Sequence, residues 1–251
     1  MTTTMKKDIH LTGQDLMGMV QLRPEDVGKY AIVPGPRERA DAVVKKLENP
    51  GKNFTFMEYT MHTGMFSGTK ITTINGGRFS PDTAITTELL CNAKVGSMIR
   101  IGSCGALRDD IKVGDLIVVD SALRGDGVTP YYVDAQFEPK TDSLLTKTLL
   151  EIAKKSGNAV HVGKVWTTDA ILRETREYVT NATKQGAIAV DMVSSVFMTL
   201  GQLYKVPTTV IMAVSDNIIT GEMGFMDPGY YMAESALVSI AFDLIKKQEG
   251  K

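Results

Sequence analysis

Short apolar runs rich in Val, Ile and Thr alternate along the chain with segments whose apolar residues recur at helical spacing. This alternation is typical of βαβ units. The apolar runs predict strands at 30–34, 70–75, 97–102, 115–120, 160–168, 187–192 and 208–216. The helical spacing predicts helices over 40–47 and 145–153, one that begins at Ser80, and a long amphipathic one over 230–247.

Several predicted strands are apolar on both faces, which is typical of a sheet covered on its two sides. The 251 residues contain no linker, internal repeat or low-complexity tract. We therefore expect an α/β fold in which residues 1–251 form a single domain. Its core would be a central mixed, largely parallel twisted sheet flanked by helices on both faces.

Two helix ends carry local signals. Ser80-Pro81-Asp82 predicts a helix start, with the Ser80 hydroxyl as N-cap, a proline in the first turn and an acid near the positive end of the dipole. Gly157 predicts the end of the helix over 145–153, because glycine adopts the left-handed conformation that closes many helices.

Composition and charge narrow the class of protein. The 28 Lys and Arg nearly balance 29 Asp and Glu, which excludes a general nucleic-acid binder. A hydrophobic content of 43% excludes a mostly disordered chain. The polar start lacks the apolar core of a signal peptide, and no apolar run approaches the ~20 residues of a membrane span. The chain has only two cysteines, Cys91 and Cys104, and no CxxC motif, which favours a reducing cytoplasm. From the charge balance and the lack of a long apolar run we expect no nucleic-acid or membrane partner.

Two predicted strands end in glycine-containing turns, where ligands bind in open α/β sheets. After the first strand, Gly35 would let the backbone approach an anion, and Arg39 at the following helix start would bind it. The alternative is a Pro/Gly turn with solvated arginines. The second turn, Asn75-Gly76-Gly77, is equally consistent with a flexible connection, and the chain contains neither a GxGxxG fingerprint nor a P-loop.

Two further strand ends carry charged residues in apolar surroundings. Arg100 interrupts an apolar strand, which is costly unless the guanidinium is paired or contacts a ligand. With Ser103 and the adjacent glycines it forms a plausible phosphate cradle, and a buried structural ion pair is the alternative. Asp216 closes another apolar strand, where it would act as a general acid or, alternatively, cap the next turn. The histidines His10, His62 and His161 show no metal-ligand spacing, so we expect no metal site.

Together these motifs resemble the nucleoside phosphorylase-I superfamily, in particular uridine phosphorylases and hexameric purine nucleoside phosphorylases. The resemblance runs from about Asp8 to Lys247. Its motifs are IHLT near the start, AIVPG followed by RER, RIGSCGA, IKVGDLIVVDSALRGDG, AIAVDM and AVSDN. RIGSCGA, which matches the second phosphate loop of that family, is the most specific of them.

The resemblance implies reversible phosphorolysis of a nucleoside to a free base and a pentose 1-phosphate. Inorganic phosphate would be the co-substrate, with no cofactor and no metal. The resemblance implies a phosphate site at Gly35, Arg39, Arg100 and Ser103. It implies nucleoside contacts from Cys104, Gly105, Asp191, Met192, Val193, Ser215 and Asp216, and from His10 of a neighbouring subunit. Arg100 and Asp216 would be catalytic, and the subunits would form dimers that assemble into a hexamer.

The chain also departs from the family pattern. Pro36 stands where the first loop normally has Asp, and Met57 stands where a neighbouring subunit usually contributes an arginine. Val193 replaces a glutamate that binds the ribose hydroxyls, and the glycine loop carries one extra residue around Arg78 and Phe79. These departures keep two alternatives open: a nucleosidase that uses water on the same fold, and a nucleoside-binding protein without activity. The uracil-binding residues of uridine phosphorylases have no clear match in 171–178, and Asp216 of AVSDN favours a purine base. The N-terminal IHLT segment, by contrast, resembles the uridine branch.

Overall fold

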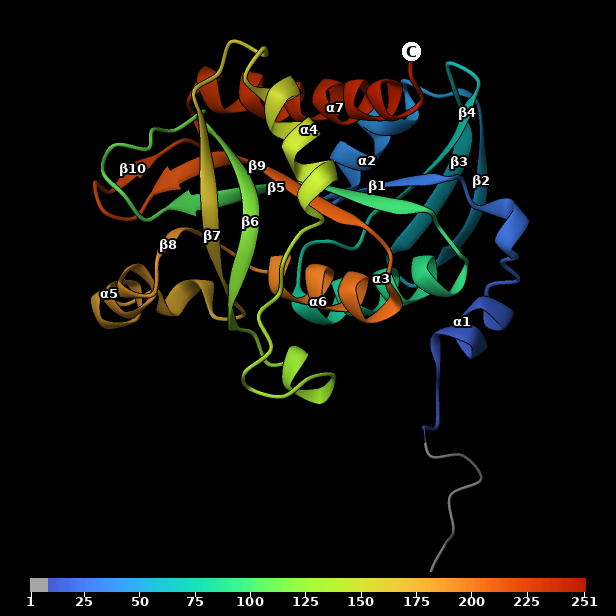
Figure 1. Cartoon of the computed structure of the whole chain (residues 1–251), viewed down its shortest axis with the longest axis horizontal. Coiled ribbons are helices and arrows are strands. Elements are labelled where there is room, and N and C mark those ends of the chain that lie inside the picture. Colours follow the sequence, from blue (N-terminus) through green and yellow to red (C-terminus); the bar gives the residue numbers. More distant parts are fainter. Residues whose placement is uncertain (1–8) are drawn as a thin grey trace, which may run out of the picture.

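In a computed structural model of the protein, residues 9–251 are described, and they form a mixed sheet with helices on both sides (Figure 1). The strands are β1 Tyr30–Pro34, β2 Glu48–Phe56, β3 Tyr59–Phe66, β4 Thr69–Ile74, β5 Ser97–Ala106, β6 Leu116–Gly125, β7 Val160–Thr168, β8 Ala187–Asp191, β9 Thr208–Asn217 and β10 Glu222–Met223. The helices are α1 Gly13–Met19, α2 Arg37–Val44, α3 Ser80–Asn92, α4 Ser143–Ala153, α5 Arg176–Lys184, α6 Ser194–Tyr204 and α7 Pro228–Gln248. Short 3₁₀ turns lie at Pro24–Asp26, Thr129–Tyr131 and Ile171–Arg173.

Strand β5 is the centre of the sheet. It pairs in parallel with β1 and β9 and in antiparallel fashion with β8. Because β9 also pairs with β6, and β6 continues through β7 to β8, the strands β5-β9-β6-β7-β8 close into a ring. On the other side of β5, strands β1, β4, β3 and β2 form an open wing.

Parallel and antiparallel pairings are equally frequent among the described strands, with five of each. The antiparallel share comes partly from the meander β2-β3-β4, whose strands are joined by short turns (Figure 1). The predicted α/β class with a mixed sheet is confirmed, and parallel pairing is concentrated around β1, β5 and β7.

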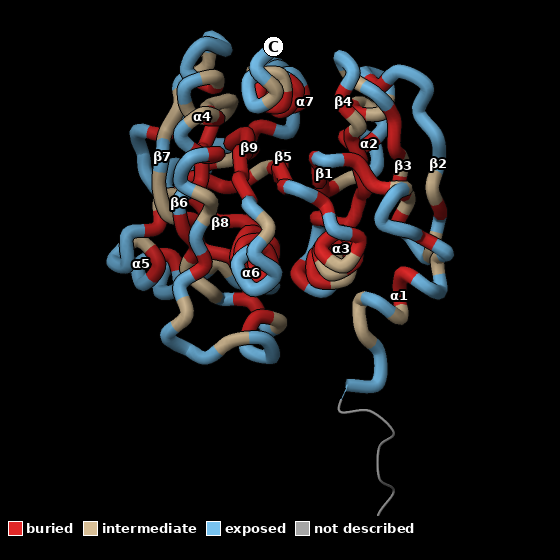
Figure 2. Tube along the Cα trace, turned by 45° about the vertical axis from the view of Figure 1, so that its right-hand side comes forward, coloured by how far each residue is buried: buried red, intermediate tan, exposed pale blue. Residues whose placement is uncertain are grey.

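The core has two layers, one on each side of the sheet. Helices α1, α3 and α6 supply apolar side chains to one layer, and α2, α4 and α7 supply the other. Strand β5 serves both layers, since Met98 lies in the first and Ile99 in the second. Figure 2 shows the central strands β1, β5 and β9 buried between these helices. Among residues 9–251 no helix combines the length and the apolar character required to cross a bilayer.

The start of α3 differs from the prediction. Phe79, with extended backbone angles, occupies the N-cap position, and Ser80 is the first helical residue. The Ser80 hydroxyl is fully buried and donates a hydrogen bond to the Met192 carbonyl at 2.8 Å. The prediction of Ser80 as N-cap was therefore wrong, because this hydroxyl satisfies a carbonyl on a distant loop rather than its own helix. The bond ties α3 to the segment after β8.

Candidate active site

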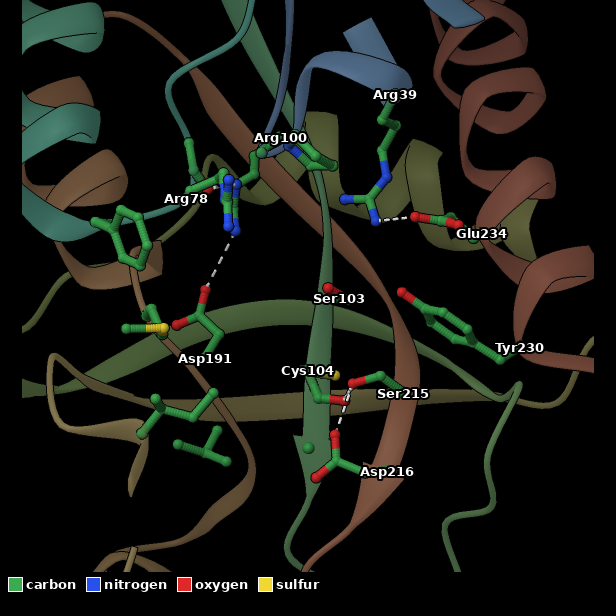
Figure 3. Close-up of a pocket in the computed structure, with 18 of the residues that line it drawn as sticks. Arg39, Arg78, Arg100, Ser103, Cys104, Asp191, Ser215, Asp216, Tyr230 and Glu234 are labelled. Carbon is green, nitrogen blue, oxygen red and sulfur yellow. Dashed lines mark hydrogen bonds and ion pairs between the residues drawn. The ribbon is translucent and has the colours of Figure 1, made fainter. Parts of the chain in front are cut away.

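A cavity of about 540 Å³ opens where β1, β5, β8 and β9 meet loops and helix α7. Its lining divides into an arginine end, formed by Gly35, Arg39, Arg78, Arg100 and Ser103, and a carboxyl end, formed by Cys104, Gly105, Glu174, Ser215 and Asp216. Figure 3 shows Arg39 and Arg100 on one side of Ser103, with Ser215 and Asp216 on the other. Most of the residues predicted from the strand ends therefore come together around one space.

Arg39 lies in the first turn of α2, directly after the turn that contains Gly35. The side chain is 5% exposed. Its Nη1 donates to the Ile101 carbonyl at 3.2 Å, and its Nη2 donates to Glu234 of α7. The Nε of Arg39 is buried and has no partner within residues 9–251. One donor of this guanidinium thus remains available while its charge is balanced by Glu234.

Arg100 lies in β5 and is equally buried. Its Nη1 donates to the Gly77 carbonyl at 2.9 Å, and its Nη2 lies 3.6 Å from the Asp191 carboxylate. A Cβ on Gly77 would lie 2.7 Å from Nη1, so the glycine loop has room for this contact only without a side chain. Burial lowers the pKa of Arg100 to about 10, against the opposing effect of Asp191. The guanidinium is still charged at neutral pH.

Asp191 ends β8 and is almost completely enclosed by donors. It accepts hydrogen bonds from the Thr167 hydroxyl at 2.9 Å, from the Ser194 amide at 3.0 Å and from the Ser194 hydroxyl at 2.6 Å. Met192 follows in the cavity lining. Val193, predicted as a sugar contact, is fully buried as the N-cap residue of α6 and lies outside the lining of the cavity.

At the carboxyl end, the Ser215 hydroxyl lies 2.6 Å from Asp216 Oδ1 and 3.1 Å from the Cys104 carbonyl, both of which accept from it. The turn after β9 is capped by Asn217, whose Oδ1 accepts from the Ile219 amide at 2.8 Å. Asn217, and not Asp216, is therefore the capping residue of this turn. Asp216 is half-buried and faces the cavity. Burial raises the pKa of the Cys104 thiol, and the nearby Asp191 and Asp216 raise it further, so the thiol stays protonated.

The structure adds residues that the sequence did not indicate. Glu174 joins the carboxyl end, where burial and then the charge of Asp216 raise its pKa to about 7. Tyr230 and Glu234, one helical turn apart on α7, line the arginine end. The spacing of Tyr230 and Glu234 on a predicted helix is a signal that sequence reasoning missed. Glu174 gives no such signal, because its proximity to Asp216 arises only in three dimensions.

His10 is exposed and lies before α1, outside the lining of this cavity. Its predicted contact was with a neighbouring subunit and stays a prediction. In the described part of the chain, no group of three or more His, Cys, Asp or Glu residues is placed to hold a metal ion.

Comparisons with known proteins identify the family of the sequence and the fold of the structure. A family model described as "Phosphorylase superfamily" matches residues 29–238. The chain is 26% identical to a uridine phosphorylase of Thermococcus kodakarensis, over 96% of this chain and 92% of that protein. It is 29% identical to a DeoD-type purine nucleoside phosphorylase of Colwellia psychrerythraea, over 81% and 88% of the respective chains. A crystal structure of uridine phosphorylase from Vibrio fischeri shares the fold, with a TM-score of 0.83, 22% identity, and coverage of 93% of this chain and 99% of the other.

The chain therefore belongs to the phosphorylase superfamily, and the family resemblance predicted from its motifs is confirmed. Both purine and uridine phosphorylases are among the relatives, so the family does not by itself fix the base.

Proposed function

We propose that the protein is a nucleoside phosphorylase, which converts a nucleoside and inorganic phosphate reversibly into a free base and a (deoxy)ribose 1-phosphate. The observation that carries the proposal is the polarity of the cavity. Buried guanidinium groups converge at one end, and carboxyl groups gather at the other. Phosphorolysis needs this arrangement, because the nucleophile is an anion and the leaving group develops negative charge.

At the arginine end, Arg39, Arg100 and Ser103, with the backbone of Gly35, would hold phosphate against the anomeric carbon. A phosphate oxygen forms the new C–O bond while the C–N glycosidic bond breaks through an oxocarbenium-like transition state. Met192 would pack against the sugar, with Asp191 beside it. Because Glu234 already accepts a hydrogen bond from Arg39 and Asp191 forms an ion pair with Arg100, phosphate must share these groups or use the donors that point into the cavity.

At the carboxyl end, the departing electron pair moves onto the base. Asp216 would donate a proton to a ring nitrogen of the base, supported by the Ser215 hydroxyl and by Cys104 and Gly105 at the floor. This chemistry favours a purine over uridine, because a purine offers a basic ring nitrogen to an acid at this position. Glu174, whose pKa is raised to about 7, is a carboxyl that can hold a proton near neutral pH beside Asp216.

Chromatographic separation of a panel of nucleosides, incubated with the protein with and without phosphate, tests the proposal. We expect phosphate-dependent release of base together with a sugar phosphate, fastest for a purine nucleoside. Absence of free base from every common nucleoside under both conditions would refute the proposal.

A second candidate is a nucleosidase that uses water as the nucleophile. It is favoured by one observation: the charges of Arg39 and Arg100 are each balanced by a carboxylate. Base release at full rate in phosphate-free buffer, without formation of a sugar phosphate, would select this alternative.

We further propose that the protein acts in the cytoplasm as a homo-oligomer, with dimers that assemble into a hexamer and with His10 reaching a neighbouring site. Support comes from the exposed His10 and from a second cavity of about 390 Å³, lined by Ile9, Leu11 and Tyr131 among others, beside α1. Light scattering of the purified protein measures the number of subunits, and a monomer at micromolar concentration would contradict this assembly.

A further inference from the structure

The balance of charge at the arginine end raises a difficulty for any anionic ligand. Arg39 is paired with Glu234, and Arg100 is paired with Asp191. Glu38 also lines the cavity but is exposed to solvent, which screens its charge. The two buried arginines and their partners Glu234 and Asp191 therefore carry equal and opposite charge and present no surplus positive charge, although taking phosphate out of water requires one.

Arg78 is a third guanidinium at this end of the cavity and differs from the other two. It is exposed, and it forms no ion pair or hydrogen bond with any residue from 9 to 251. The guanidinium carbon lies 5.3 Å from the centre of the Phe79 ring, whose face attracts a cation. Its positive charge is therefore available to a ligand.

The position of Arg78 is fixed by the two turns that form the arginine end. The Gly77 amide donates to the Pro34 carbonyl at 3.3 Å, and the Gly77 carbonyl accepts from Arg100. The side-chain stem of Arg78 lies against Gly35, where a Cβ on the glycine would come within 3.6 Å of Arg78 Cγ. Figure 3 shows Arg78 beside Arg100 at the upper side of the cavity.

We propose that Arg78 is a phosphate-binding residue of this site and supplies, from the same chain, the positive charge that Arg39 and Arg100 do not. Arg39 and Arg100 then orient the oxyanion through hydrogen bonds, while Arg78 provides the net attraction. This inference rests on the proposed phosphorolysis, because it concerns the binding of the same phosphate.

The experiment is titration calorimetry of the full chain with inorganic phosphate, combined with the KM for phosphate at saturating nucleoside. Arg78→Met keeps the stem against Gly35 and removes the charge. Arg37→Ala is the matched control, since Arg37 is an exposed arginine at the start of the nearby helix α2 and lies outside the cavity lining. We expect Arg78→Met to raise both the phosphate Kd and the phosphate KM about tenfold or more. Arg78→Lys should recover part of the affinity, and Arg37→Ala should remain within about twofold of the unmodified protein.

Three results would overturn the inference, and they have different meanings. If Arg78→Met binds phosphate as tightly as the unmodified protein, or if Arg37→Ala weakens it equally, Arg78 has no specific role, and phosphorolysis stands. If the unmodified protein neither binds phosphate nor requires it for base release, the proposed function fails together with the role of Arg78. A rise in the nucleoside KM without a change for phosphate would also refute it.

Discussion

At the arginine end of the cavity the buried charges have internal partners, whereas at the carboxyl end Asp216 is half-buried and held by the single side chain of Ser215. The arginine end is built from strand β5, helix α7 and two short turns tied together by backbone hydrogen bonds. The carboxyl end includes Glu174, which follows the short 3₁₀ turn after β7. One end is thus held in place by many contacts, and the other by few.

The largest effect is expected from a substitution at the arginine end, where the side chains are held by more contacts. Arg100→Ala removes a phosphate donor and leaves Asp191 buried without its cation. We expect kcat/KM for phosphate to fall about a hundredfold or more, together with a loss of about 3 kcal/mol in the free energy of unfolding. Steady-state kinetics and urea unfolding measure the two quantities.

The double variant Arg100→Met with Asp191→Asn separates the two effects. It should regain much of the stability and none of the phosphate use, because the buried charge is gone and the donor is still missing. Recovery of phosphorolysis in the double variant would show that Arg100 serves only the internal ion pair.

The next effect concerns the carboxyl end. Asp216→Asn keeps the shape of the side chain and replaces the carboxyl by an amide, which cannot act as a general acid. We expect purine turnover to fall about ten- to a hundredfold, with little change in stability. Turnover of a pyrimidine nucleoside is the internal control, and an equal fall there would contradict the general-acid role.

A smaller effect follows from the titration of Glu174. Its pKa is raised from 4.5 to about 7, so the folded state holds a proton that the unfolded state releases. Stability therefore decreases as pH rises from about 4.5 to about 7 and is constant above that range. Glu174→Gln should abolish this decrease, which we expect to be about 1–2 kcal/mol because the group is partly solvated.

Glu174→Gln also tests by kinetics whether Glu174 titrates at the carboxyl end. An inflection near pH 7 in the pH profile of kcat/KM should disappear in Glu174→Gln. Thermal melts at pH 5 and pH 8 give the stability difference. An unchanged profile and an unchanged difference between the two melts would exclude Glu174 as the titrating group.

The smallest effect tests the pairing at the arginine end. Glu234→Gln keeps a hydrogen-bond acceptor for Arg39 and removes the competing negative charge. We expect the KM for phosphate to fall about threefold, because Arg39 then binds the anion without an opposing carboxylate. A rise in this KM would indicate that Glu234 is needed to hold Arg39 in its productive position.

Much of the fold and part of the site could be predicted from local patterns. The strands beneath the cavity are uninterrupted apolar runs, and Arg100 was detectable because a charge inside such a run needs a partner. Helix α6 was missed, because its residues Ser194–Gly201 are buried on all sides and show no amphipathic period. The pairing of Arg39 with Glu234 joins residues 195 positions apart, and no local pattern contains such a distance. The exposure of Arg78 and the raised pKa of Glu174 likewise depend on the assembled cavity.

Strand β5 carries Arg100 at the arginine end of the cavity and Gly105 at its carboxyl end. The strand is hydrogen-bonded to β1, β8 and β9. Because three strands hold β5, the sheet sets the backbone distance between these two residues, at most about 17 Å for five residues at the usual rise of ~3.3 Å per residue. The arginine end and the carboxyl end therefore cannot move apart independently, and any adjustment to a larger or smaller ligand must come from the side chains and loops around β5.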